Sequence, residues 1–206
     1  MPDKLVEWST AIQMREGEVM SGDHYSICPV GERVLVSVVD GIGHGPEAAE
    51  ASRLAVSILE AHAEEPLVSL FSLCHKELKH TRGVVMSLAI FDGANNSLSW
   101  LGVGNVVGRL LRADKTSMYS EEELLTYSGV VGHEMPTMLI FSVLPVFKGD
   151  VLILATDGVA PEFSKSIHIG RSAHQLANDI LSKHSKGTDD ALVIVAKYRK
   201  DPIGSE

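Results

Sequence analysis

The chain has 206 residues, of which 45% are hydrophobic and 22% are charged. This composition supplies enough apolar side chain for a buried core without disulfides or structural zinc, and it excludes a disordered or low-complexity protein. With 18 Lys and Arg against 27 Asp and Glu, the net charge is −9, which argues against nucleic acid or an anionic membrane as the main partner. We expect a single domain over residues 1–206.

Hydropathy and the two cysteines predict a cytoplasmic protein. No apolar run approaches the roughly 20 residues needed to cross a bilayer, and the polar residues 1–10 do not resemble a signal peptide. Cys28 and Cys74 form no CxxC pair, so we interpret them as reduced, buried thiols.

The first part of the chain predicts one strand followed by two helices. Residues 33–39 are short, rich in β-branched side chains and followed by Asp40-Gly41, which is typical of a strand that ends in a turn. Apolar residues at i, i+3 and i+4 over residues 46–62 predict an amphipathic helix with Pro46 in its first turn. A second helix is expected from Pro66, burying apolar positions from Leu67 to Leu78.

Strands dominate the second part of the chain. We expect them at residues 84–91, 97–103, 106–111, 137–144, 151–155 and 191–198, with one helix at 172–186. Residues 112–136 are the least regular, and the three glutamates at 121–123 are interpreted as a solvated charge run. The tail from Lys200 is expected to fray.

This order of elements differs from the alternating βαβα pattern of a doubly wound sheet. Two adjacent helices, several strands, one helix and one strand favour an α+β fold with mostly antiparallel pairing. We therefore predict a two-sheet antiparallel β-sandwich flanked by helices.

Four aspartate sites lie where predicted strands begin or end beside small residues. An Asp-Gly pair at any one of them is also a common turn sequence. Carboxylates gathered at the strand ends of a sandwich would repel one another unless a cation lay between them. An all-oxygen ligand set suits Mg²⁺ or Mn²⁺, and two such ions would form a site for attack of water on a phosphate. The four sites are Asp23, Asp40, Asp157 and the pair Asp189-Asp190.

Five ordered blocks resemble the metal-dependent Ser/Thr protein phosphatases of the PPM family, and the DG-x-GHG form resembles their SpoIIE-like bacterial members. The resemblance covers nearly the whole chain, and its stand-alone length is similar to that of members acting on stressosome components. The blocks are Gly22-Asp23, Asp40-Gly41-Ile42-Gly43-His44-Gly45, Gly104-Asn105, Thr156-Asp157-Gly158 and Asp189-Asp190.

The resemblance implies a role for each acidic position. Asp40 would bridge two Mn²⁺ or Mg²⁺ ions and the Gly41 carbonyl would bind one of them. Asp157 and Asp189 would complete the ligands of the second ion. Asp23 would lie in the outer shell or orient a water molecule on a metal. The same resemblance implies hydrolysis of phosphoserine or phosphothreonine by a metal-activated water, without a covalent phosphoenzyme.

Two positions near these ligands carry weaker expectations. Asp190 stands where relatives have Asp or Asn, so we rank it below Asp189 as a ligand. His44 lies beside the predicted cluster and either contacts phosphate or donates a proton there, or caps the helix that starts at Pro46.

The favoured hypothesis is thus a protein phosphatase acting on small bacterial regulators of a partner-switching stress pathway, of the stressosome or anti-sigma antagonist type. A non-catalytic docking protein that keeps the phosphatase fold is the alternative, and a phosphohydrolase of small molecules is a third hypothesis. A binding protein has no need to keep Asp40, Asp157 and Asp189 together, because clustered carboxylates cost stability.

Overall fold

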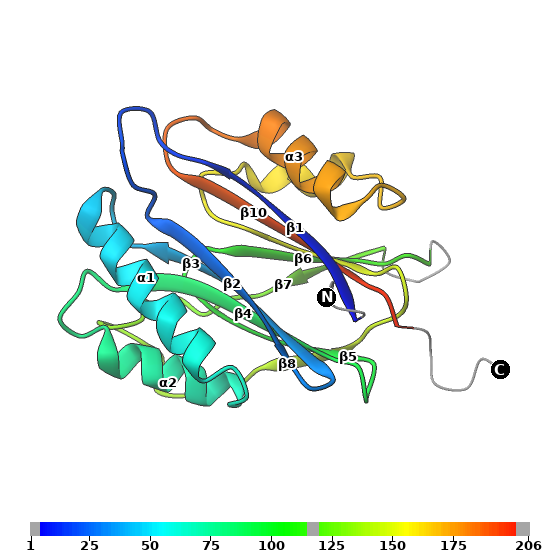
Figure 1. The fold of residues 1–206 in the computed structure, drawn as a ribbon, viewed down its shortest axis with the longest axis horizontal. Coiled ribbons are helices and arrows are strands. Elements are labelled where there is room, and N and C mark those ends of the chain that lie inside the picture. The colour runs from blue at the N-terminus through cyan, green and yellow to red at the C-terminus, as the bar shows by residue number, and fades with distance from the viewer. Residues whose placement is uncertain (1–4, 115–119, 201–206) are drawn as a thin grey trace.

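The computed structural model describes residues 5–114 and 120–200, which form a four-layer molecule of two β-sheets covered by helices (Figure 1). Each sheet has five strands, and all pairings between those strands are antiparallel. The predicted α+β sandwich is therefore confirmed. The tail expected to fray beyond Lys200 lies outside the described residues, as do residues 115–119 of the irregular segment.

One sheet contains both ends of the described chain. Its strand order is β1-β10-β9-β6-β7. The N-terminal strand β1 therefore pairs with the C-terminal strand β10 along its whole length. The bounds are β1 Val6–Gln13, β10 Ala191–Tyr198, β9 Val151–Ala155, β6 Val107–Leu111 and β7 Glu121–Leu124.

The second sheet is built largely from consecutive strands, in the order β2-β3-β4-β5-β8. Its two central strands, β3 and β4, are almost wholly buried because sheet and helices cover their two faces. The bounds are β2 Asp23–Val30, β3 Arg33–Gly41, β4 Val84–Asp92, β5 Ser97–Val103 and β8 Ser142–Pro145.

Helices cover the outer face of each sheet. The helices α1 (Pro46–Ala61) and α2 (Leu67–Glu77) pack on the β2–β3–β4–β5 side, and α3 (Ala173–His184) packs on β1 and β10 (Figure 1). A short 3₁₀ helix, Pro161–Ser166, precedes α3. None of the described helices is long and apolar enough to cross a membrane.

Three apolar clusters hold the layers together. One lies between the sheets around Phe91, Trp100 and Tyr198, one lies under α1 and α2, and one lies under α3. Cys74 is a fully buried free thiol of the second cluster, and burial raises its pKa to about 12, whereas Cys28 is half-buried and also free.

Three parts of the predicted secondary structure are wrong. Strands β1 and β2 were not expected, because their sequences lack a continuous apolar run. The strand expected at 137–144 is shorter, since only Ser142–Pro145 pairs with β5. The glutamates at 121–123 form strand β7, in which they pair with arginines, instead of a solvated run.

Candidate functional site

The two sheets place four predicted acidic residues at one end of the sandwich. Asp40 is the penultimate residue of β3, and Asp23 begins β2 directly opposite it in the strand register. In the other sheet, Asp157 follows β9 by two residues and Asp189 precedes β10 by two. Because β9 and β10 are antiparallel neighbours, the end of one strand lies beside the start of the other.

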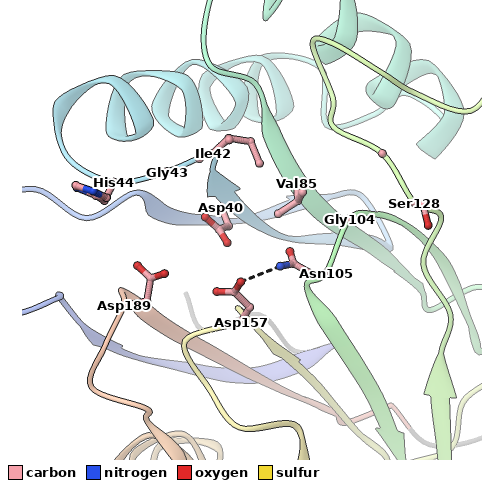
Figure 2. Close-up of a pocket in the computed structure, with 12 residues that line it drawn as sticks. Asp40, Ile42, Gly43, His44, Val85, Gly104, Asn105, Ser128, Asp157 and Asp189 are labelled. Carbon is pink, nitrogen blue, oxygen red and sulfur yellow. Dashed lines mark hydrogen bonds between the residues drawn. The ribbon is translucent and has the colours of Figure 1, made fainter.

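Asp40, Asp157 and Asp189 face one pocket of about 460 Å³ between the sheet ends (Figure 2). Gly41 and His44, both predicted site residues, line the same pocket. Its walls thus combine the DG-x-GHG turn, the ends of the β9 and β10 strands, and residues that sequence reasoning did not select. The full lining is Asp40, Gly41, Ile42, Gly43, His44, Val85, Gly104, Asn105, Ser128, Gly129, Asp157 and Asp189.

Asp23 is only 4% exposed and does not line this pocket. Its carboxylate Oδ2 accepts a hydrogen bond of 2.7 Å from the Thr156 hydroxyl. That hydroxyl in turn accepts from the backbone N–H of Leu192 at 2.9 Å. Thr156 therefore links β2 of one sheet to β10 of the other immediately next to Asp157.

The carboxylates raise one another's proton affinity. Burial, followed by the negative charges of Asp23, Asp157 and Asp189, raises the pKa of Asp40 to about 9. Burial also raises the pKa of Asp23 to about 7, although the hydrogen bond from Thr156 acts in the opposite direction. A bound cation would remove this penalty, because it favours the charged form of every carboxylate around it.

Close packing requires glycine beside two of the acidic residues. A β-carbon at Gly41 would lie 2.1 Å from the carbonyl oxygen of Ala48 in α1, and one at Gly158 would lie 1.9 Å from the carbonyl oxygen of Asp190. These glycines let the α1 backbone and the β10 entry segment come close to Asp40 and Asp157.

Asp157 has two polar supports that sequence reasoning missed. The side-chain amide of Asn105 donates to its carboxylate Oδ2 at 2.8 Å (Figure 2). Lys186 Nζ donates to its backbone carbonyl at 2.6 Å. Asn105 was visible in the Gly104-Asn105 block, whereas nothing in the sequence near Lys186 indicates its contact.

Asp190 has a different environment from Asp189. Its Oδ1 accepts from the backbone N–H of Arg15 at 2.9 Å, and its Oδ2 accepts from that of Gly22 at 2.7 Å. It is nearly buried and lies outside the pocket lining. Asp190 thus anchors the β1–β2 loop behind the site, whereas Asp189 lines the pocket.

His44 is an exposed residue at the rim of the pocket. Its Nδ1 lies 2.8 Å from the Glu18 carboxylate, which comes from the β1–β2 loop. Helix α1 has no side-chain cap at its N-terminus, where Gly45 is the N-cap. The helix-capping interpretation of His44 is therefore wrong.

The donor set fits a hard divalent cation. Three carboxylates face the pocket with a glycine backbone beside them, and no thiol lines it, so the chemistry favours Mg²⁺ or Mn²⁺ over zinc. Within the described ranges, no three His, Cys, Asp or Glu side chains lie close enough together to enclose an ion. Mg²⁺ usually keeps several water ligands and is bound through one or two carboxylates, which agrees with carboxylates spaced around an open pocket.

Comparison with known families identifies one that matches most of the chain. The family model described as stage II sporulation protein E (SpoIIE) matches residues 30–199. The match includes Asp40, Asp157 and Asp189 and begins after Asp23.

Solved structures show the same architecture. A chain solved in work on the bacterial stressosome, a modular system adapted to control secondary messenger signalling, is 30% identical, with a TM-score of 0.84 over 93% of this chain and 99% of that one. RsbX in complex with magnesium is 22% identical, with a TM-score of 0.85 over 96% and 98%. The PP2C phosphatase domain of SpoIIE from Bacillus subtilis is 20% identical, with a TM-score of 0.74 over 96% and 64%.

Proposed function

Because the chain belongs to the SpoIIE family, we propose that it is a metal-dependent phosphatase of phosphoserine and phosphothreonine in proteins. Its proposed substrates are small cytoplasmic regulators of a partner-switching stress pathway, of the stressosome or anti-sigma antagonist type. The proposed cofactor is a pair of Mn²⁺ or Mg²⁺ ions.

The convergence of Asp40, Asp157 and Asp189 on one pocket carries this proposal. The three residues come from strand ends of two different sheets, and they bring three carboxylates to one pocket although like charges repel one another. Burial and mutual repulsion raise the pKa of Asp40 to about 9, so the cluster is unfavourable without a cation. Such a cost is typical of a site kept for its chemistry.

Each residue has a proposed role. Asp40 would bridge two ions, the Gly41 carbonyl would bind one of them, and Asp157 and Asp189 would hold the second. Asp23 would hold its neighbour Asp40 in place from outside the pocket. Bound ions of this kind lower the pKa of water and neutralise phosphoryl oxygens during in-line attack.

The surroundings of the pocket support a phosphoryl group as the ligand. Asn105 and His44, both exposed, place polar side chains at opposite parts of its lining (Figure 2). His44 is proposed to donate a proton or a hydrogen bond to the phosphate, with Glu18 orienting its ring through Nδ1.

The relatives support the substrate class. The 30% identical chain was solved in work on the stressosome, and its whole length matches this one almost completely. RsbX, which binds magnesium in its structure, has a similar length and fold. A protein substrate also agrees with a pocket whose rim residues are exposed.

The test is phosphate release from p-nitrophenyl phosphate and from a panel of serine-phosphorylated regulatory proteins, with Mn²⁺, Mg²⁺ or EDTA. We expect release that requires a metal and is lost in Asp40→Asn. Asp92→Asn, in the hairpin after β4 and outside the pocket lining, is the control for removal of an acidic side chain. Turnover in EDTA would contradict the proposal, as would the absence of both turnover and metal binding, and the latter result would favour the docking protein.

A further inference from the structure

An apolar surface lies along the edge of the sheet that leads to the pocket. Its side chains are between 44% and 82% exposed. Residues 135–147 include no charged side chain, although 22% of the whole chain is charged. We call this surface the apolar edge, and it consists of Leu125, Met138, Ile140, Phe141 and Val143.

Hydrogen bonds hold together the two chain segments that carry these residues. Strand β8 pairs Ser142 with Trp100 of β5, and the Trp100 indole N–H donates to the carbonyl of Leu125 at 3.1 Å. The Tyr127 hydroxyl accepts from the backbone N–H of Ile140 at 3.1 Å and donates to its carbonyl at 3.3 Å. The two segments that carry the apolar edge are therefore fixed to each other.

The same segment continues into the pocket. Beyond β8, the outer edge of β5 is covered by Tyr127, which exchanges backbone hydrogen bonds of 2.8 Å with Gly102 and Gly104. The next two residues, Ser128 and Gly129, line the pocket. From Trp100 to Val103, where β5 ends, is three residues, or about 10 Å of strand, and the pocket residue Asn105 follows two residues later. The apolar edge therefore lies within reach of a folded protein whose phosphate occupies the pocket.

Edge-to-edge pairing with a second copy is disfavoured. Pro145 of β8 has no N–H to donate, and its carbonyl already accepts from Arg112 Nη1 at 2.7 Å, so the outer edge cannot be extended regularly by another strand. Two chains of net charge −9 also repel each other. The apolar edge therefore offers a partner its side chains and not its strand backbone.

We infer that the apolar edge is the docking surface for the protein substrate, which contacts it with an apolar patch beside its phosphorylated serine or threonine. This inference rests on the proposed function and deepens it. Contact at the apolar edge would favour folded phosphoproteins over short phosphopeptides, because a folded surface holds its apolar patch and its phosphorylated residue at fixed positions, whereas a flexible peptide loses conformational entropy to reach both.

The test is a triple variant, Leu125→Gln/Met138→Gln/Ile140→Gln, compared with wild type and with Val19→Gln. Val19 is 83% exposed on the β1–β2 loop and lies outside the apolar edge. Its substitution therefore controls for the loss of an exposed apolar side chain elsewhere on the surface. Three substrates are used: p-nitrophenyl phosphate, the phosphoprotein of the panel that wild type hydrolyses fastest, and a short phosphopeptide from that protein. The oligomeric state of each variant is measured by light scattering.

We expect the triple variant to raise KM for the phosphoprotein about tenfold or more, while both small substrates and the Val19→Gln control are unaffected. Unchanged phosphoprotein kinetics would overturn the inference. A dimeric wild type that becomes monomeric in the triple variant would assign the surface to a second copy instead.

If wild type hydrolyses neither small substrates nor phosphoproteins with either metal, the surface is tested by binding. The dissociation constants of wild type and the triple variant for the same phosphoproteins are then compared. Weaker binding by the triple variant supports the docking surface, whereas equal binding, or none by wild type, overturns it.

Discussion

Asp23 and Asp40 are direct partners across the β2–β3 ladder, so two carboxylates occupy neighbouring positions at the same strand ends. Like charges opposite each other destabilise a sheet. Here the pair is also largely buried, and burial and the charge of Asp23 both raise the pKa of Asp40. The arrangement is costly for the metal-free fold and favourable for a fold that holds a cation.

Asp40→Asn is expected to separate activity from stability. The amide is neutral at every pH, so folding no longer has to protonate or desolvate a carboxylate at this position, and the variant should unfold at a higher temperature than wild type in EDTA. Its metal-dependent turnover should fall by more than about 100-fold. Removal of a group that only orients a metal ligand costs up to about 100-fold, and Asp40 is proposed to bind the ions directly. Thermal unfolding in EDTA and steady-state kinetics with Mn²⁺ measure the two effects, and a variant that is less stable in EDTA would contradict the repulsion argument.

The pH dependence of stability follows from the same cluster. An unfolded aspartate titrates near pH 3.8, whereas the folded, metal-free protein has a pKa of about 7 for Asp23 and about 9 for Asp40. Between these values the folded state holds more protons than the unfolded state, so the free energy of unfolding falls as pH rises from about 4 to about 9.

Urea unfolding in EDTA between pH 5.5 and 9 measures this slope. Asp40→Asn should flatten it, and excess Mg²⁺ should reverse it, because the ion binds the deprotonated carboxylates. A metal-free stability that rises with pH over this interval would contradict the assigned environment of Asp40.

Asn105 is expected to position Asp157 for its ligand. Its side-chain amide donates to Oδ2 of Asp157 at 2.8 Å. This hydrogen bond sets the orientation of the carboxylate and therefore the direction in which its other oxygen points. Asn105→Ala should weaken Mn²⁺ binding by about 10- to 100-fold, as for other groups that orient a ligand. Isothermal titration with Mn²⁺ reads this directly, without turnover.

The hairpin after β4 offers a matched control. Asn95 donates from its side-chain amide to the Asp92 carboxylate at 2.9 Å, at the opposite end of β4 and β5 from the pocket. Asn95→Ala removes the same kind of bond and should leave Mn²⁺ affinity at the wild-type value. Equal affinities of the Asn105→Ala variant and wild type would assign Asn105 to packing alone.

The sequence predicted the strands with the strongest apolar patterns well. The bounds expected at 97–103, 151–155 and 191–198 coincide with β5, β9 and β10, because these strands are buried on both faces or nearly so. Strands β1 and β2 escaped prediction, since each mixes exposed and buried positions without strict alternation. Their place in the sheets is fixed by partners that are distant in sequence.

The candidate ligands were predictable because each lies at the end of a recognisable strand. Their supports were not. Lys186 contacts the carbonyl of Asp157, 29 residues earlier in the chain, and Thr156 contacts Asp23 across 133 residues. Such contacts depend on how the two sheets stack, and no local pattern encodes that stacking.

The glutamate-rich strand β7 shows how charge can hold an edge that its sequence disfavours. Glutamate is uncommon in strands, but Glu122 pairs with Arg112 and Glu123 pairs with Arg109 on the neighbouring part of β6. Arg112 is nearly buried and also binds the fully buried Asp150 through Nη1 at 2.8 Å. Each arginine therefore pairs with a glutamate of β7, but the Arg112 pair is more buried than the Arg109 pair.

Arg112→Met is expected to lower the free energy of unfolding by about 3 kcal/mol, because it leaves the buried Asp150 carboxyl group without its cation. Arg109→Met should cost about 1 kcal/mol or less, since its partners Glu121 and Glu123 are both partly exposed. Urea unfolding of both variants at constant pH measures the difference. Equal losses of unfolding free energy would contradict the argument that the more buried ion pair contributes more. Hydrolysis of p-nitrophenyl phosphate by both variants should match wild type, because neither arginine lines the pocket.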